Sequence, residues 1–350
     1  MLRLACCSLL VASVGWAQEG NERAALLAKD NASAQRSLKL IREKIATIKA
    51  PALRATVLAL VETPRPSFVE RFPDAAARDA VRLALVKEGL LDAAVTVEQL
   101  FPPLPAKGAV QCFACSAGNP PTKHHGYPGG LAEHTAFNLQ SALALEQLYR
   151  SQLDTTLLDH DLLVATPVLH DLLKTWTLQW NADGTTLTQP KVGGTASHHV
   201  FIVAEALHRK LDPTLVIALA AAHEPNGQPV VAYLRAAAVL AGVDPVEAKV
   251  LRADGTLPQI VLPEGAINHL SDHDYVLVDP AEGAVREALT RLLVARAAEK
   301  KVTLTEAEQR WELHRIETRA PGLKLYFAAA RGGDEALAAE LRRSKVTLLP

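Results

Sequence analysis

The sequence predicts an all-α protein, and three observations support this fold class. Alanine and leucine dominate the chain, whereas alternating β-branched residues are scarce. Apolar residues recur at spacings of three and four, which is the periodicity of an amphipathic helix. Proline and glycine separate these periodic segments. With 350 residues, of which 49% are apolar and 21% charged, the chain can bury a sizeable core.

The balance of charges argues against a strongly charged partner. Lysine and arginine total 37 against 38 acidic residues, so no global field favours nucleic acid or an anionic membrane surface. Aromatic residues are only 5% of the chain, which is few for a base-stacking surface. The composition therefore carries no strong nucleic-acid signature.

The first residues, 1–17, have the pattern of a signal peptide. Arg3 gives a positive start, residues 4–14 form an apolar run too short to span a bilayer, and Gly15 and Ala17 are the small residues that a signal peptidase recognises. The alternative is a frayed apolar helix. No later run is apolar enough to be transmembrane. We therefore expect an exported protein, periplasmic or secreted.

Residues 18–105 form an N-terminal helical region without chemical motifs. Apolar periodicity predicts helices over 23–29, 34–49, 51–61 and 75–87. The region is typical of a helical cap, and such flanking helices could support a homo-oligomer. The proline-rich stretch 101–105 predicts an extended boundary.

Two cysteines, Cys112 and Cys115, form a CxxC motif. In an exported protein a short-range disulfide is the favoured interpretation. A redox-active pair is less favoured, because no thioredoxin-like strand-to-helix pattern surrounds it. A zinc site would need two further ligands, for which His124 and His125 are the candidates.

Histidine and aspartate then appear on apolar helices, where charge is costly unless it is compensated. Gly129 and Gly130 precede a predicted helix at 131–149 that carries His134. A second predicted helix, 159–176, carries the adjacent pair His170 and Asp171. A buried aspartate needs a partner, and a cation is a common one. Lys174, three residues beyond Asp171, could hold that carboxylate or a phosphate.

Further helices carry more residues of the ligand type. The predicted helices are 195–210, 211–223, 230–240 and one from Pro263 through Asp272. His198 and His199 enter the first of these, so one of the two can face the site, and His223 ends the second. The turn signal at 253–255 predicts a small β-hairpin pairing 249–251 with 259–261.

After residue 284 the pattern predicts only amphipathic packing helices, at 285–300, 305–318 and 334–343. This C-terminal helical region, 285–350, carries no chemical motif.

Two motifs resemble the HD-domain superfamily of metal-dependent phosphohydrolases. The first is YPGGLAEHT at 127–135, which is similar to the Tyr-x-Gly-Gly-Leu-x-x-His-Thr motif of HD-type 3′–5′ exoribonucleases. The second is LHDLLK at 169–174, in which Leu173 stands where the family usually has glycine. The resemblance implies an HD-type helical bundle at 106–284, with the small hairpin as an insertion and helical segments on either side.

The resemblance also implies a ligand set and a mechanism. The expected ligands are His134, His170, Asp171, His199, His223 and a last aspartate, for which Asp272 is preferred to Asp244 because 264–272 fits the family's terminal helix. Such nitrogen and oxygen ligands suit one or two ions of Mn, Fe, Ni or Zn. Asp171 would bridge two ions that share a hydroxide, and Lys174 would neutralise phosphoryl charge.

Other residues are expected around this centre. Lys123, His124 and His125 could contact substrate phosphate, although solvated loop residues are an equally good interpretation, and Glu133 and Asp274 could orient the ligands. The function implied is an exported phosphomonoesterase or phosphodiesterase acting on a small phosphorylated substrate, possibly a nucleotide. The alternative is an inactive HD-fold binding or scaffold protein with at most a structural metal, which Leu173 and the choice between Asp272 and Asp244 favour.

Overall fold

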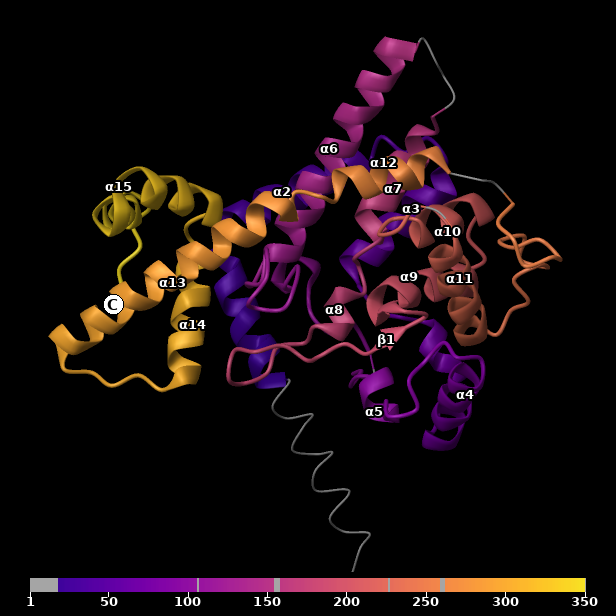
Figure 1. The fold of residues 1–350 in the computed structure, drawn as a ribbon, viewed down its shortest axis with the longest axis horizontal. Helices are drawn as coiled ribbons and strands as arrows, with labels where there is room; N and C mark the ends of the chain where they lie inside the picture. Colours follow the sequence, from indigo (N-terminus) through magenta and orange to yellow (C-terminus); the bar gives the residue numbers. More distant parts are fainter. Residues whose placement is uncertain (1–17, 106, 154–157, 226, 259–261, 350) are drawn as a thin grey trace, which may run out of the picture.

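The computed structural model describes residues 18–105, 107–153, 158–225, 227–258 and 262–349, and it is mainly helical (Figure 1). The prediction of a mostly helical protein is confirmed. Within the described residues the only sheet is a two-stranded antiparallel one. None of the helices in these ranges is long and apolar enough to cross a membrane.

The N-terminal region consists of short helices with local capping residues. After helical residues 18–29 come α2 (Ala32–Ile45), α3 (Pro51–Glu62), η1 (Phe68–Arg71), α4 (Ala75–Lys87) and α5 (Val97–Leu100). Asn31 and Asp74 cap α2 and α4 through their side chains, and Thr96 forms a capping box at α5. Ile41, Ile45 and Leu85 are fully buried in the main core, so this region packs onto the bundle that follows.

The central bundle surrounds α6, which packs against α2, α7 and α12. Its elements are η2 (Phe113–Cys115), α6 (Gly130–Leu153), α7 (His160–Leu169), α8 (Lys174–Thr177), α9 (Ser197–His208), α10 (Pro213–Ala220), α11 (Gln228–Ala241) and α12 (Pro263–Ser271). Helix α9 packs on α10 and α11. Leu131, Val168 and Phe201 lie in the shared core, so α6, α7 and α9 belong to one hydrophobic unit.

The predicted helix 159–176 is interrupted exactly where the His-Asp pair lies. Helix α7 contains Pro167 and ends at Leu169, and α8 starts at Lys174. Between them the backbone makes tight turns, in which Leu172 and Lys174 donate to Leu169 and Asp171. The continuous helix was therefore wrong, because the proline in α7 removes a backbone donor and the chain turns soon after it.

The hairpin lies elsewhere than predicted. Strands β1 (Lys191–Val192) and β2 (Thr195–Ala196) pair antiparallel around Gly193 and Gly194. Both glycines have positive φ, at 61° and 92°, as a tight hairpin turn requires. Residues 249–251 form no strand, since their N–H groups donate to the carbonyls of Pro245 and Val246 in local turns, and 259–261 lie outside the described residues.

The C-terminal region has its own small core. It consists of α13 (Tyr275–Lys300), α14 (Glu306–Glu317) and α15 (Gly322–Arg343), which bends at Gly332 and Gly333. Leu289 and Ile316 are buried within it. Helix α13 starts ten residues before the predicted 285–300 segment and crosses the expected boundary at 284/285, so one helix joins the bundle to this region (Figure 1).

Candidate metal centre

The tertiary structure gathers histidines and aspartates from five parts of the bundle. His134 lies in the first turns of α6, and His170 and Asp171 lie in the turn after α7. His198 and His199 begin α9, His223 follows α10, and Asp272 caps the end of α12. Two groups of ligand atoms result, each with all its atoms within 4.8 Å of one another: His134, His170, Asp171 and Asp272 in one, and Asp171, His198, His199 and His223 in the other.

Asp171 belongs to both groups because its two oxygens face different histidines. Its Oδ2 lies 3.2 Å from His134 Nε2 and 3.5 Å from His170 Nε2. Its Oδ1 lies 3.0 Å from His198 Nε2 and 3.5 Å from His223 Nε2. The carboxylate therefore stands between the two groups, where a bridging ligand would stand.

Asp272 is the second carboxylate of the centre. Its Oδ1 lies 2.9 Å from His134 Nε2 and 3.4 Å from His170 Nε2, and its Oδ2 lies 3.2 Å from His223 Nδ1. Asp244, the alternative last ligand, lies away from the centre and accepts from the backbone N–H groups of Val246 and Glu247. The structure thus brings together the preferred aspartate and not its alternative.

The hydrogen bond of His170 fixes where its proton lies. Its Nδ1 is 2.8 Å from the carbonyl oxygen of Pro167, which can only accept, so Nδ1 carries the proton. In the neutral ring Nε2 then presents a lone pair, and this buried atom has no hydrogen-bond partner. It points between Asp171 and Asp272. Lone pairs that face carboxylates attract a proton or a cation.

His198 shows the same arrangement on the other side of Asp171. Its Nδ1 lies 2.6 Å from Gln189 Oε1, so the ring donates there and leaves Nε2 as a lone pair. That Nε2 and Asp171 Oδ1 are both buried without a hydrogen-bond partner although they lie 3.0 Å apart. A cation between them would satisfy both atoms.

The pKa shifts of the buried side chains agree with a concentration of negative charge at the centre. Burial opposes ionisation of Asp171, but Lys174 and His170 hold its pKa well below the usual range. Burial would lower the pKa of His134, but Asp171 and Asp272 raise it to about 10. Burial, together with the nearby charges of Lys174 and His223, outweighs Asp171 and lowers the pKa of His198 to about 3, so this ring is neutral. A neutral imidazole is the form that binds a metal.

Of the two adjacent histidines of α9, His198 makes the closer approach to Asp171. His199, the residue expected from the sequence, has Nδ1 2.5 Å from Thr195 Oγ1 and stacks on His223 with ring centroids 3.4 Å apart. Both histidines belong to the second group. The sequence predicted that one of the two histidines faces the site. The approach of His198 to Asp171 depends on Gln189, which orients the His198 ring and lies outside the two motifs.

Lys174 is held by the carboxylate rather than left free for a phosphate. Its Nζ donates to Asp171 Oδ2 and to the carbonyl oxygen of Gly118, each at 2.6 Å. The side chain is buried beside the ligands and also lines the cavity described below. Its direct contact is therefore with Asp171, the acid that the two groups share.

His124 and His125 lie buried over the outer side of His134. Their ring centroids are 5.4 and 5.5 Å from that of His134, and the three histidines form a third group of closely spaced ligand atoms. His124 Nε2 contacts Asn119 at 2.7 Å, and the two Nδ1 atoms lie 3.2 Å apart. Lys123, the third expected substrate contact, is exposed at the rim. The pair is thus part of the centre's wall.

A cavity of about 710 Å³ opens onto the centre. At its base lie His134, Lys174, His198, His199, His223 and Asp272. Its walls come from the loops around Lys123 and Thr186 and from Tyr275 and Asp279 on α13. A small molecule could therefore reach the histidines and aspartates from outside.

The two carboxylates expected to orient the ligands differ in position. Glu133 points away from the centre, toward Asn31 and Tyr127. Asp274 Oδ1 lies 3.9 Å from His134 Nδ1, and both atoms are buried without a hydrogen-bond partner. Burial raises the pKa of Asp274 to about 6. Of the two, only Asp274 lies next to an expected ligand, His134.

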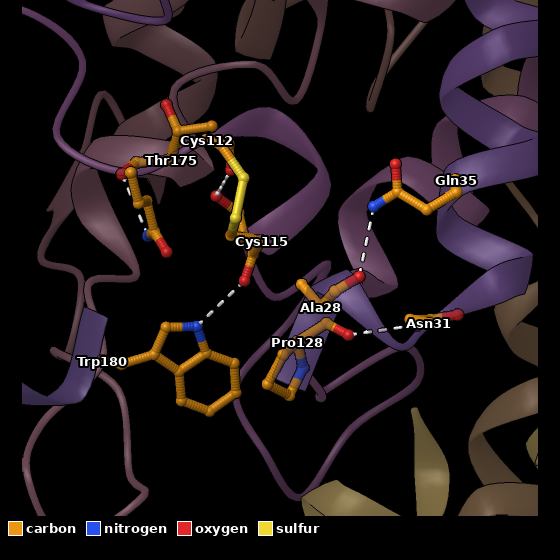
Figure 2. The surroundings of a disulfide bond; sticks show 10 residues. Ala28, Asn31, Gln35, Cys112, Cys115, Pro128, Thr175 and Trp180 are labelled. Carbon is orange, nitrogen blue, oxygen red and sulfur yellow. Dashed lines mark hydrogen bonds between the residues drawn. A yellow bond between two sulfur atoms is a disulfide. The ribbon is translucent and has the colours of Figure 1, made fainter. Parts of the chain in front are cut away.

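The segment that leads into the centre contains a disulfide between Cys112 and Cys115, as Figure 2 shows. The carbonyl oxygen of Cys115 accepts from Trp180 Nε1 at 3.3 Å. Ser116 and Gly118 follow, and their carbonyls bind Leu131 N–H and Lys174. The disulfide therefore lies at the start of the segment that carries His124 and His125, and we interpret it as a structural bond.

Comparisons with known proteins add no assignment to this geometry: the chain matches no family model, no curated protein and no solved structure.

Proposed function

We propose that this protein is a metal-dependent phosphohydrolase of the HD-domain type, in which the two groups around Asp171 bind one or two divalent transition-metal ions. The observation that carries the proposal is the set of unpaired buried atoms that converge on two carboxylates: His170 Nε2, His198 Nε2, His223 Nε2, Asp171 Oδ1 and Asp272 Oδ1. Buried polar atoms without partners are rare in proteins. One or two cations would satisfy all of them.

The donor types support a transition metal. Imidazole nitrogens and carboxylate oxygens in one site suit Mn, Fe, Ni or Zn, and they are not the all-oxygen set preferred by Mg. When bound, such ions supply Lewis acidity and lower the pKa of a coordinated water toward ~7. The His170 and His198 rings are already oriented for binding by Pro167 and Gln189.

The protein's own residues account for the remaining tasks. Lys174 holds Asp171 in its bridging position. The cavity admits a small phosphoester, and Lys123 at its rim offers a positive charge to the phosphate. His124 lies between the rim and His134, where its imidazole can contact a phosphoryl oxygen. The reaction class proposed is hydrolysis of a phosphomonoester or phosphodiester.

Export is part of the proposal. It is supported by the signal-peptide pattern of residues 1–17, which lie outside the described residues, and by the Cys112–Cys115 disulfide, since such bonds persist in oxidising compartments. N-terminal sequencing of the protein recovered from the outer compartment tests this part. The expected first residue is Gln18.

Metal analysis of the purified chain, followed by a panel of phosphomonoesters and phosphodiesters with added Mn, tests the activity. We expect bound transition metal, turnover on at least one class of ester, and loss of both in His170→Ala. His208→Ala is the matched control, because His208 lies at the far end of α9 from the centre. It should keep both metal and turnover.

The alternative, an inactive HD-fold binding or scaffold protein, predicts a different result. It predicts no turnover on the panel and at most one ion of structural metal, with His170→Ala changing no activity. Leu173, the substitution that favours this alternative, is fully buried in the hydrophobic core. Its side chain therefore packs away from the cavity.

A further inference from the structure

Two carboxylates of α13 contact the backbone of the His124–His125 turn. The N–H of His124 donates to Asp279 Oδ1, and the N–H of His125 donates to Glu282 Oε2 at 2.6 Å. These residues are separated by more than 150 positions in the sequence. The contacts therefore exist only because α13 leaves the end of α12 and runs past this turn.

The turn has a backbone that needs such support. His125 has a φ of 55°, in the left-handed region that non-glycine residues rarely adopt. Its carbonyl accepts from Gly118 N–H at 2.9 Å and lies so close to Gly130 that a Cβ there would be 2.0 Å away. A conformation of this kind persists only when surrounding contacts determine it. Asp279 and Glu282 supply contacts on the side that faces α13.

Glu282 lies against the start of α15 in the C-terminal region. It is 7% exposed, and a Cβ on Gly322 at the start of α15 would lie 3.1 Å from its Cγ. One turn later on α13, Arg286 binds Glu317 of α14 through two hydrogen bonds of 2.5 and 2.7 Å. The turn is thus connected through α13 to the separate core of the C-terminal helices.

We propose that Asp279 and Glu282 are positioning residues that hold the His124–His125 turn at the wall of the cavity, so that the C-terminal helical region completes the substrate side of the site. The substrate contact made by His124 rests on the function proposed above. Asp279 and His124 both line the cavity, so displacement of the turn changes the surface that a substrate meets. The ligands around Asp171 come from other elements and keep their positions.

Variants of Glu282 test whether this residue positions the His124–His125 turn without affecting metal binding. Glu282→Ala removes the acceptor for His125 N–H, whereas Glu282→Gln keeps an acceptor oxygen of the same reach. In the full chain we expect Glu282→Ala to raise KM about tenfold, the effect of losing one buried hydrogen bond. Metal content and kcat should stay within about twofold of the parent protein, and Glu282→Gln should restore KM. Glu287→Ala, an exposed acid on the same helix, is the matched control.

Hydrogen exchange measured by mass spectrometry gives a readout that does not depend on activity. The peptide covering 118–130 should exchange faster in Glu282→Ala and in Asp279→Ala than in the parent protein, and Glu282→Gln should be protected. Asp279 is only partly buried, so its variant tests the turn if Glu282→Ala fails to fold. Unchanged exchange in both alanine variants would overturn the proposal. Loss of bound metal in a folded Glu282→Ala would overturn it too.

The two proposals can fail separately. If the parent protein binds no metal and turns over no ester, the phosphohydrolase function fails. The exchange experiment still decides whether α13 fixes the turn. If turnover is present but KM is unchanged in both alanine variants, the phosphohydrolase function stands and the positioning role is wrong.

Discussion

The candidate metal centre and the C-terminal region both bury histidine beside carboxylate, but they satisfy these groups differently. In the C-terminal region, His314 Nε2 donates to Gly184 carbonyl oxygen at 2.9 Å and its Nδ1 lies 3.2 Å from Arg286. Arg286 in turn binds Glu317. Each imidazole nitrogen of His314 has a partner within the chain. At the candidate metal centre, His170 Nε2 and His198 Nε2 have no hydrogen-bond partner.

The difference shows how a structural histidine can be distinguished from a ligand. Both kinds are buried, and both lie near acids. Both nitrogens of a structural histidine have hydrogen-bond partners within the protein. The neighbouring acid is neutralised by a cationic side chain of the same protein. A ligand histidine directs a lone pair at a carboxylate, which is stable only with a further cation. Four experiments test this contrast.

The largest effect is expected from Asp171→Asn. Because Asp171 serves both groups, the substitution should lower the affinity for transition metal by more than the ~100-fold typical of an outer partner. Inductively coupled plasma analysis after dialysis against trace metal measures the content. The control is Asp244→Asn, which should keep full metal content because Asp244 lies away from the centre. Equal metal content in both variants would contradict the assignment of the bridging acid.

Glu317→Ala should affect stability and leave the metal unaffected. It leaves Arg286 buried without its acid, which costs about 3–5 kcal/mol, and urea unfolding measures the loss. The double variant Arg286→Met with Glu317→Leu should recover most of that stability, since no buried charge remains. Loss of metal from a folded Glu317→Ala protein would show that the two regions are not independent.

Gln189→Ala tests the orientation of His198. Without the Gln189 acceptor, the His198 ring loses the contact that holds its proton on Nδ1, and metal affinity at the second group should fall about 10–100-fold. Competition with a chromogenic chelator measures the affinity. Gln140→Ala on the exposed face of α6 should leave it unchanged. An unchanged affinity in Gln189→Ala would contradict the orienting role of Gln189.

The smallest expected effect is the change in metal affinity for each pH unit. Burial disfavours the charged form of His134, but Asp171 and Asp272 raise its pKa to about 10, so the ion-free ring is protonated at neutral pH. A metal must displace this proton, so affinity should rise roughly tenfold per pH unit from 6 to 8. Calorimetry in buffers of different ionisation enthalpy should show about one proton released from this ring. An affinity that falls with rising pH would contradict this sign.

The sequence located much of the centre because its signals are local. A glycine pair before His134, and the His170–Asp171 pair within an apolar segment, can each be recognised without knowing the fold. Asp272 is preferred to Asp244 because 264–272 resembles the terminal helix of HD-domain proteins. The structure brings His134, His170, Asp171 and Asp272 into one group, and it leaves Asp244 outside.

Several features could not be obtained in this way. The end of α7 before His170 and the position of the hairpin were predicted wrongly, although Pro167 and the Gly193–Gly194 pair carried the relevant local signals. The preference for His198 depends on Gln189, and the support of the His124–His125 turn depends on Asp279 and Glu282. No spacing in the sequence relates these residues.

The sequence by itself determined the helical character of the chain and the kinds of ligand it offers, because periodicity and residue chemistry are properties of short segments. Only the tertiary structure decided which imidazole nitrogen faces Asp171 and that α13 reaches the site. Those outcomes depend on directions of side chains and on packing between distant helices. The direction of a lone pair or a hydrogen bond depends on atomic positions to within about one ångström. The order of residues alone does not specify such positions.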